Sequence, residues 1–337
     1  MRAFVITAPG RYEVTEVEPP HAAAGHVVVD VERAGVCGTD VEVLSGHMAY
    51  LESGEAQYPM RIGHEWCGRI SAVGAGVDPA WIGRRVTADT MLGCGDCARC
   101  RAGRHNICAE RFEIGLRGGW PGAVAEQVGA PAGAVHVLPD TIDPACGAMI
   151  EPGGNAWRAV DASGLVGGDR LLIIGSGTIG LLAALFAKAQ GIEVHVLGID
   201  RRTLDLAVDL GADGAWTTAD LPSLGFGAAV DASTSAASAG VAVEVVEPGG
   251  RVVLVGVAAE PSTVDSRRLV MKDLHAVGLL AGSFGLAGAI RAYATGAVDP
   301  RPLIAATVSL GETGAILEGR RPPGAGAGPK VHIDPRQ

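Results

Sequence analysis

The 337-residue chain contains 48% hydrophobic and 19% charged residues, which is typical of a soluble globular protein, and it is long enough for two domains that each bury a core. Its formal net charge of -10 argues against nucleic acid or an anionic membrane as the main partner, because both attract basic patches. No run approaches the ~20 uncharged apolar residues that cross a bilayer, and the N-terminus indicates a strand and not a signal peptide, so we expect a cytoplasmic protein.

The first 35 or so residues alternate apolar and polar side chains, which predicts short antiparallel strands. Cys37 follows between two glycines, in a turn that leaves its thiol accessible, although it could also be a small buried core residue. His64 and Glu65 then place an imidazole beside a carboxylate. Together these three types of side chain are the ligand set of a catalytic zinc ion that keeps one position open.

A third protein ligand could be Glu65 or Glu151. Glu151 is a lone acid in the apolar and glycine-rich stretch 150–155. Its other interpretation is an acid at a helix N-terminus, where the helix dipole favours negative charge.

Four of the seven cysteines follow the pattern C-x2-C-x2-C-x7-C, with glycines that permit sharp turns: Cys94, Cys97, Cys100 and Cys108. Four thiolates at this spacing suit a closed tetrahedral zinc site, in a lobe of about residues 93–109. Two disulfides would be strained and out of place in a reducing compartment. An iron-sulfur cluster is a further alternative that the spacing permits.

The stretch 171–191 predicts a strand, a tight turn and a helix, with the spacing G-x-G-x-x-G at Gly175, Gly177 and Gly180. The first glycine permits the turn, the second lets a pyrophosphate approach the backbone, and the third lets the helix pack on the strand. The helix N-terminus then offers free N–H groups to phosphates. Alone the motif is weak evidence, because methyltransferases and flavoproteins also use it. The later apolar runs 226–231 and 250–256 predict further strands of a doubly wound parallel sheet.

Taken together, these clusters resemble those of the zinc-containing medium-chain dehydrogenase/reductase superfamily, of alcohol, sorbitol and threonine dehydrogenase type. The resemblance covers nearly the whole chain. It rests on the motifs Gly35-Val-Cys-Gly-Thr-Asp40, Gly63-His-Glu65, the four-cysteine lobe, Glu151-Pro152, Gly175-Ser-Gly-Thr-Ile-Gly180, Leu210-Gly-Ala-Asp213 and Gly249-Gly-Arg-Val-Val-Leu-Val-Gly256.

The resemblance implies an α/β fold with a β-rich GroES-like catalytic domain and a Rossmann domain. We expect the catalytic domain at 1–150, the NAD(P)-binding domain at 151–287 and a C-terminal return to the catalytic domain at 288–337. It also implies one catalytic and one structural zinc ion, and a nucleotide site at Gly175, Gly177, Thr178, Ile179 and Gly180.

For the catalytic site, the resemblance implies that Cys37 and His64 hold zinc, with Glu65 and Glu151 binding it directly or through water. Asp40 would accept a hydrogen bond from the ring of His64. Thr39 would take the proton from the substrate alcohol.

In the alcohol dehydrogenases a histidine completes that proton relay, five residues after the cysteine. The corresponding residue here is Glu42, and His47 lies farther along the chain. The end of the relay is therefore open between these two residues.

The second strand of the nucleotide domain ends near Asp200, a candidate to bind the ribose 2′-OH of NAD. The spacing usual in the family instead assigns the acidic position to Gly198. A small residue there, followed by Arg201 and Arg202, would leave room and donors for a 2′-phosphate, which favours NADP. The two arginines could equally be a solvated helix start.

We therefore expect a zinc-dependent alcohol/polyol dehydrogenase that transfers hydride between a secondary alcohol and NAD(P), with a polyol, sugar or cyclitol favoured because of Glu151-Pro152. One alternative is a catalytically altered zinc- and nucleotide-binding protein of the same fold, which Glu42 permits. A zinc-free quinone-reductase-like member is another. The resemblance further implies a homo-oligomer, either a dimer or a tetramer, acting on a small alcohol or ketone.

Overall fold

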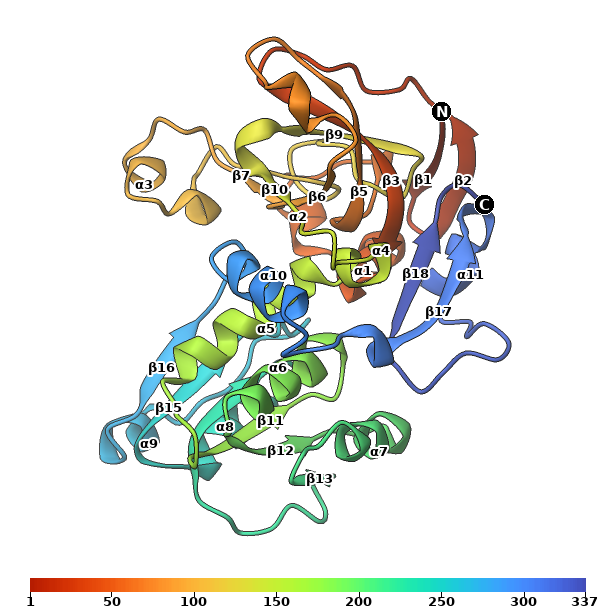
Figure 1. Ribbon diagram of the computed structural model, residues 1–337. Helices are drawn as coiled ribbons and strands as arrows, with labels where there is room; N and C mark the ends of the chain where they lie inside the picture. Colours follow the sequence, from red (N-terminus) through yellow and green to blue (C-terminus); the bar gives the residue numbers. More distant parts are fainter. The chain divides into compact units, whose positions relative to one another are not determined.

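The computed structural model describes residues 1–337, and the chain divides into two compact units. Unit 1 comprises Met1–Glu151, Ile304–Gly326 and Lys330–Gln337, and unit 2 comprises Pro152–Leu303 and Ala327–Pro329 (Figure 1). Both units contain helices and strands, as expected for an α/β protein. None of the helices combines the length and the apolar character that a membrane span requires.

The chain returns to unit 1 at Ile304, later than the residue 288 expected from the sequence. Helix α10 (Leu286–Ala294) stays in unit 2 because its apolar face is buried there. Tyr293 of this helix stacks on Phe186, with ring centroids 5.8 Å apart.

Unit 1 is built mainly from strands. They are β1 (Arg2–Ala8), β2 (Arg11–Glu16), β3 (His26–Gly35), β4 (Met60–Arg61), β5 (Glu65–Val73), β6 (Arg85–Ala88), β7 (Met91–Leu92), β8 (Phe112–Glu113), β9 (Gln127–Pro131), β10 (Val135–Val137), β17 (Ile304–Ser309) and β18 (Lys330–Asp334). One sheet has the order β2-β1-β4, and a second has the order β10-β6-β5-β3-β18-β17 with β9 also paired to β3. Strands β7 and β8 pair separately.

The helices of unit 1 are short and join these strands. They are α1 (Gly38–Ser45), α2 (Ala49–Glu52), α3 (Ala98–Arg101), α4 (Pro144–Ala148) and α11 (Thr313–Leu317), with 3-10 turns η1 (Pro79–Trp81), η2 (His105–Ile107), η3 (Ala132–Ala134) and η5 (Leu310–Glu312). Helix α5 (Ile150–Ser163) begins at the end of the first segment of unit 1 and continues into unit 2.

The end of β3 positions the site of unit 1. Gly35, its last residue, is paired with Glu65 of β5 on one side and with His332 of β18 on the other, both antiparallel. A Cβ atom on Gly35 would lie 2.2 Å from Glu65 Oε2, so this position has no room for a side chain. The register therefore places the starts of β5 and β18 beside the turn that carries Cys37.

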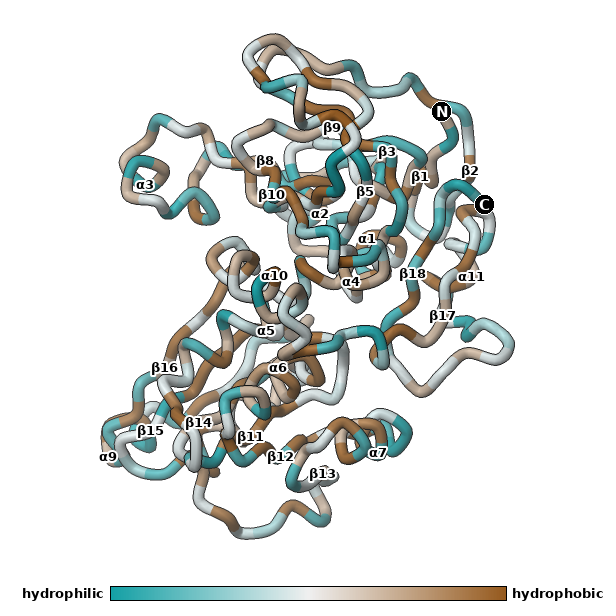
Figure 2. The backbone as a smooth tube through the Cα atoms, in the orientation of Figure 1, coloured by the Kyte–Doolittle hydropathy of each residue, from teal (hydrophilic) through white to brown (hydrophobic).

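Unit 2 contains a six-stranded parallel sheet of order β13-β12-β11-β14-β15-β16, which is the doubly wound topology that the sequence predicted. Its strands are β11 (Arg170–Ile174), β12 (Glu193–Leu197), β13 (Gly214–Trp216), β14 (Phe226–Asp231), β15 (Val246–Leu254) and β16 (His275–Gly278). The helices are α6 (Thr178–Ala189), α7 (Arg201–Asp209), α8 (Ser238–Val245), α9 (Ser266–Met271) and α10, with the 3-10 turn η4 (Arg301–Leu303). The central strands are apolar because both faces of the sheet are covered (Figure 2).

Candidate functional site

Three predicted ligands converge in unit 1. Cys37 is the N-cap of α1, whereas Glu65 is the first residue of β5 and His64 directly precedes it. One ligand atom from each of Cys37, His64 and Glu65 lies within 4.8 Å of the others. His64 and Glu65 are buried, with 6% and 2% of their surfaces exposed. A thiol, an imidazole and a carboxylate this close together, drawn from separate segments, form a donor set that fits a zinc ion.

Asp40 contacts two members of this cluster, Cys37 and His64. Its carboxylate accepts a hydrogen bond from the backbone N–H of Cys37 at 2.9 Å, which fixes the turn that carries the thiol. Asp40 Oδ1 and His64 Nδ1 are 3.8 Å apart, and neither atom has a hydrogen-bond partner. The contact is therefore electrostatic, and the hydrogen bond expected between the carboxylate and the ring is not formed in this structure.

The buried charges of the cluster act on one another. Burial disfavours the charged form of His64, but the Cys37 thiolate, Asp40 and Glu151 hold the pKa of the imidazole well above its usual value. Burial raises the pKa of Asp40, against the lowering effect of His64. The negative groups around the ring therefore create a site that attracts a cation.

Lys330 belongs to this cluster, and the sequence analysis did not identify it. Its Nζ atom donates to Glu65 Oε2 at 2.5 Å and to the carbonyl oxygen of Val36 at 2.7 Å. The two charged side chains are buried, with 3% and 2% of their surfaces exposed. Burial alone would lower the pKa of Lys330, but the carboxylate of Glu65 raises it above its usual value.

The signal for Lys330 in the sequence is weak. It is the first residue of a short C-terminal strand and lies 265 positions from Glu65. Only the pairing of β18 with β3 brings it to the site. A charged residue next to an apolar strand normally indicates a solvated strand end, so the sequence gives no reason to select it.

The other predicted residues of the catalytic site lie around the cluster. Glu151 is buried near the N-terminus of α5, and its negative charge raises the pKa of His64. It is not one of the three residues whose ligand atoms lie within 4.8 Å of one another. Thr39 Oγ1 lies 3.8 Å from Cys37 Sγ.

The two candidates for the end of the proton relay differ in their surroundings. Glu42 is half-buried in α1, and burial raises the pKa of its carboxyl group. His47 is exposed and contacts the hydroxyl of Ser45 at 3.3 Å.

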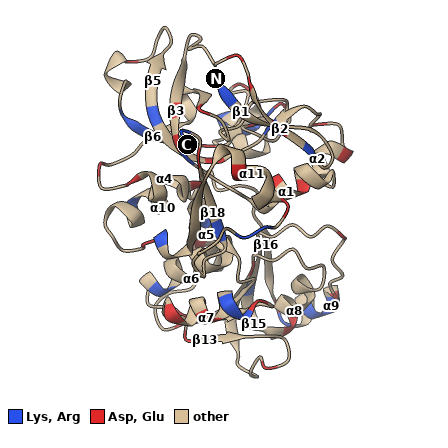
Figure 3. Ribbon diagram, turned by 90° about the vertical axis from the view of Figure 1, so that its right-hand side faces the viewer, with Lys and Arg blue, Asp and Glu red and all other residues tan.

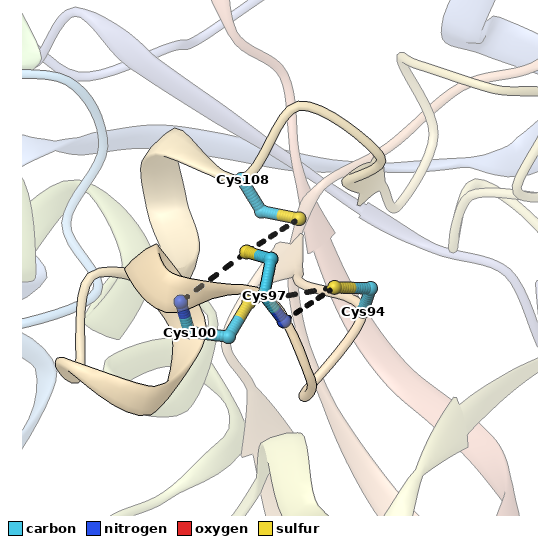
Figure 4. A group of neighbouring side chains, drawn as sticks. All are labelled: Cys94, Cys97, Cys100 and Cys108. Atoms are coloured by element: carbon cyan, nitrogen blue, oxygen red, sulfur yellow. Dashed lines mark hydrogen bonds between the residues drawn. The ribbon is translucent and has the colours of Figure 1, made fainter.

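The second candidate metal site contains all four cysteines of the lobe. Their sulfur atoms lie within 4.8 Å of one another, and the side chains point toward a common centre (Figure 4). Cys94 Sγ is 3.9 Å from Cys100 Sγ, and Cys97 Sγ is 3.8 Å from Cys108 Sγ. These separations exclude disulfide bonds, which need about 2.05 Å. They match the edge of a tetrahedron with metal–sulfur bonds of about 2.3 Å, for which geometry gives roughly 3.8 Å.

In unit 2 the three glycines follow β11 as predicted. Gly175 has φ +109°, which favours glycine, and a Cβ atom on Gly180 would lie 1.9 Å from the carbonyl oxygen of Gly175. A Cβ atom on Gly177 would meet nothing within 4 Å. Gly177 is also the N-cap of α6 and has no side chain to cap it, so the helix N-terminus is open to a phosphate.

Asp200 was expected near the end of β12, as a candidate to bind the ribose 2′-OH, but it lies beyond the strand. The strand ends at Leu197, and Asp200 caps α7 by accepting the backbone N–H of Arg202 at 3.0 Å. Gly198 directly follows the strand, where a Cβ atom would lie 2.4 Å from Ser176 Oγ. Arg202 pairs with Asp200 at 2.8 Å and Arg201 with Asp220 at 2.9 Å, so both charge signs gather on and around α7 (Figure 3).

Comparison with known proteins identifies two family matches in the chain. Residues 23–140 match the family described as alcohol dehydrogenase GroES-like domain, and residues 178–295 match the family described as zinc-binding dehydrogenase. L-threonine 3-dehydrogenase of Saccharopolyspora erythraea is 35% identical over 291 residues, which cover 83% of each chain.

Two solved structures have nearly the same fold over 99% of both chains. One is described as a short chain alcohol dehydrogenase (rspB) from Escherichia coli CFT073 with the cofactor NADH, at 27% identity and a TM-score of 0.90. The other is described as a zinc-binding dehydrogenase from Sinorhizobium meliloti 1021 bound to NADP, at 28% identity and a TM-score of 0.89.

Proposed function

Because the chain belongs to the zinc-containing medium-chain dehydrogenase/reductase superfamily, we propose that it oxidises a secondary alcohol at the group formed by Cys37, His64 and Glu65. Membership makes the chain an NAD(P)-linked oxidoreductase that acts on CH–OH groups. The single observation that carries the assignment of the site is the convergence of three ligand types in unit 1. The relative named L-threonine 3-dehydrogenase supports a secondary alcohol as the substrate.

The substrate class that we favour is a polyol, sugar or cyclitol. The motif Glu151-Pro152 is closer to the sorbitol and threonine dehydrogenase pattern than to that of enzymes that oxidise simple alcohols. Glu151 is buried and raises the pKa of His64, so it adds negative charge where a cation would bind.

Cys37, His64 and Glu65 would hold the catalytic zinc, with Glu151 as the further carboxylate. When bound there, zinc supplies Lewis acidity that lowers the pKa of an alcohol, and NAD(P) supplies the hydride acceptor. Asp40 keeps the backbone N–H of Cys37 in place and balances the charge of His64. Lys330 holds Glu65 by an ion pair.

Side chains of this chain would form part of the relay that removes the proton of the alcohol. Thr39 is the hydroxyl beside Cys37 and would take that proton first. Of the two candidates for the next step, Glu42 lies in the same helix and has a raised pKa, which suits a group that must accept a proton. His47 is the alternative.

The four-cysteine lobe would hold a second, structural zinc ion. Four sulfur ligands leave no position open for water or substrate, which is the mark of a structural site. The ion would fix a lobe that has little secondary structure beyond α3 and η2.

We favour NADP as the preferred nicotinamide cofactor. Gly198 offers no carboxylate to the ribose, Asp200 is engaged as the cap of α7, and the guanidinium groups of Arg201 and Arg202 lie at the start of that helix. Both arginines now pair with aspartates, so binding of a 2′-phosphate would require an exchange of partners.

A homo-oligomer is the assembly that we propose. Strand β16 is an edge of the parallel sheet in unit 2, and most of its residues are exposed, so it has unpaired backbone groups available to a second copy. Size-exclusion chromatography with light scattering would measure the number of subunits.

The experiment that tests the function measures NAD(P) reduction against a panel of polyols, cyclitols, L-threonine and simple secondary alcohols, with NAD and NADP in parallel. We expect turnover with a polyol or cyclitol of the panel and its loss in Cys37→Ala. Zinc analysis of the same samples separates the alternatives. A zinc-loaded protein that binds cofactor without turning over any substrate would support the catalytically altered protein, whereas absence of zinc would support a quinone-reductase-like member.

A further inference from the structure

A cavity lies in unit 1, and none of the candidate metal ligands lines it. Its volume is about 280 Å³, and Met60, Arg61, Gln57, Leu116, Trp120 and Pro121 contribute to its lining. None of Cys37, His64, Glu65 and Glu151 lines it, and no aspartate or glutamate does. Arg61 is therefore the only charged side chain in the cavity wall.

Arg61 differs from the other arginines of unit 1 that are half-buried. Each of the other five pairs with a carboxylate: Arg2 with Glu126, Arg33 with Asp334, Arg85 with Glu32, Arg111 with Glu113 and Arg117 with Glu55. The guanidinium group of Arg61 forms no hydrogen bond and no ion pair with another group of the chain. Burial lowers the pKa of this group, and no partner offsets the effect.

An unpaired and partly desolvated guanidinium reduces stability, because burial of a charge without a partner costs free energy. The chain satisfies its other half-buried arginines and leaves this one open to a cavity. The amide of Gln57, an exposed residue, lines the same cavity and forms no hydrogen bond with another group of the chain. Arg61 and Gln57 therefore both offer N–H donors at a cavity whose lining has no carboxylate.

The rest of the cavity is mainly apolar, and hydrogen bonds and ring contacts hold its wall. The indole N–H of Trp120 donates to the carbonyl oxygen of Gly129 at 3.0 Å, and the ring packs against His26 and Phe112. The loop 115–120 is closed by a hydrogen bond from the N–H of Gly115 to the carbonyl oxygen of Trp120 at 2.9 Å. A ligand would therefore meet a preformed wall, which lowers the entropic cost of binding.

We propose that this cavity is a binding site for a small organic carboxylate, with the carboxylate on Arg61 and Gln57 and an apolar or aromatic body against Trp120, Met60 and Leu116. Arginine binds a planar carboxylate through two parallel N–H donors. A single positive charge matches a monoanion. The apolar lining favours an organic ligand over inorganic phosphate, which would need further donors. The volume suits a ligand the size of a small fragment.

The site can be tested by isothermal titration calorimetry with three probes: benzoate, its neutral analogue benzamide, and inorganic phosphate. We expect benzoate to bind with a Kd on the order of 1 mM and benzamide at least about tenfold more weakly. Equal binding of benzoate and benzamide would overturn the proposal, as would tighter binding of phosphate or no binding of benzoate at 20 mM.

Variants test whether benzoate binds in this cavity or at a metal ion, which also attracts carboxylates. Arg61→Met should weaken benzoate at least about tenfold, and Arg61→Lys should restore part of the affinity. Arg84→Met, at an exposed arginine of the same unit, should bind as the unmodified protein does. Unchanged binding by Arg61→Met would overturn the proposal. Because Arg61 has no partner to lose, its replacement should not lower Tm, and the comparison of benzoate with benzamide on the unmodified protein does not depend on any variant.

Discussion

Lys330 Nζ and Glu65 Oε2 form a buried ion pair at 2.5 Å between the C-terminal strand and the start of β5. The pair closes unit 1 by joining its last segment to the segment that carries His64. It also fixes the carboxylate that lies within reach of Cys37 and His64. The C-terminal strand is therefore a part of the candidate site.

Replacing Lys330 by Met tests how much this ion pair contributes to the stability of the protein. We expect a loss of about 3–5 kcal/mol in the free energy of unfolding, because the carboxylate of Glu65 stays buried without its partner. Urea denaturation would measure it. The double variant Lys330→Met with Glu65→Gln should recover a large part of the loss, since neither charge is then left unpaired. Equal losses in the single and double variants would contradict this account.

The burial of His332 predicts that unit 1 loses stability in acid. The imidazole is fully buried, neither ring nitrogen has a hydrogen-bond partner, and burial together with Lys330 and Arg33 lowers its pKa to about 3. The unfolded chain binds a proton near pH 6.5, whereas the folded chain binds it only near pH 3. Stability is therefore complete above pH 6.5 and is lost as the pH falls from there toward 3.

Between pH 7 and pH 5 this group should reduce stability by about 2 kcal/mol. The urea midpoint of His332→Leu should therefore fall less over this interval than that of the unmodified protein. His21→Gln, at an exposed histidine, is the matched control and should behave as the unmodified protein. The same pH dependence in all three proteins would show that His332 has no such role.

Substitution of two glycines of the nucleotide loop should distinguish an effect on folding from an effect on cofactor binding. Gly180→Ala brings a Cβ atom to 1.9 Å from a carbonyl oxygen, so we expect a lower Tm and loss of cofactor binding. The Cβ atom of Gly177→Ala meets nothing within 4 Å, so the variant should keep Tm within about 2 °C of the unmodified protein. It should bind NAD(P) more weakly, because its methyl group occupies the space of the phosphates. Calorimetry and thermal denaturation measure the two effects. Unchanged cofactor affinity in Gly177→Ala would contradict the assignment.

The cofactor preference depends on the start of α7. The double variant Arg201→Ala with Arg202→Ala should lower the affinity for NADP by about tenfold or more and leave that for NAD nearly unchanged, because only NADP has a 2′-phosphate. Arg291→Ala, at an exposed arginine of unit 2, is a charge control. Equal effects on both cofactors would contradict the preference for NADP.

The sequence predicted features that depend on local spacing. The four cysteines and the glycine loop lie within short segments, so their positions follow from the turns between them. The parallel sheet was also predictable, since each of its central strands is an apolar run.

Long-range features were less accessible. Lys330 reaches Glu65 only through the pairing of β18 with β3, and a single charged residue in the sequence does not reveal its partner. The return to unit 1 was expected too early, because the apolar face of α10 fits either unit as a pattern. Asp200 looked like a ligand of the ribose, but its side chain caps α7, a role that the same residue type also serves.

The central claim is that Cys37, His64 and Glu65 bind one zinc ion. Anomalous diffraction from a crystal at the zinc absorption edge tests it most directly. The account predicts two peaks per chain, one among the four cysteines and one within bonding distance of Cys37 Sγ and a ring nitrogen of His64. A single peak at the four cysteines, with Cys37 and His64 free of metal in a fully zinc-loaded sample, would contradict it.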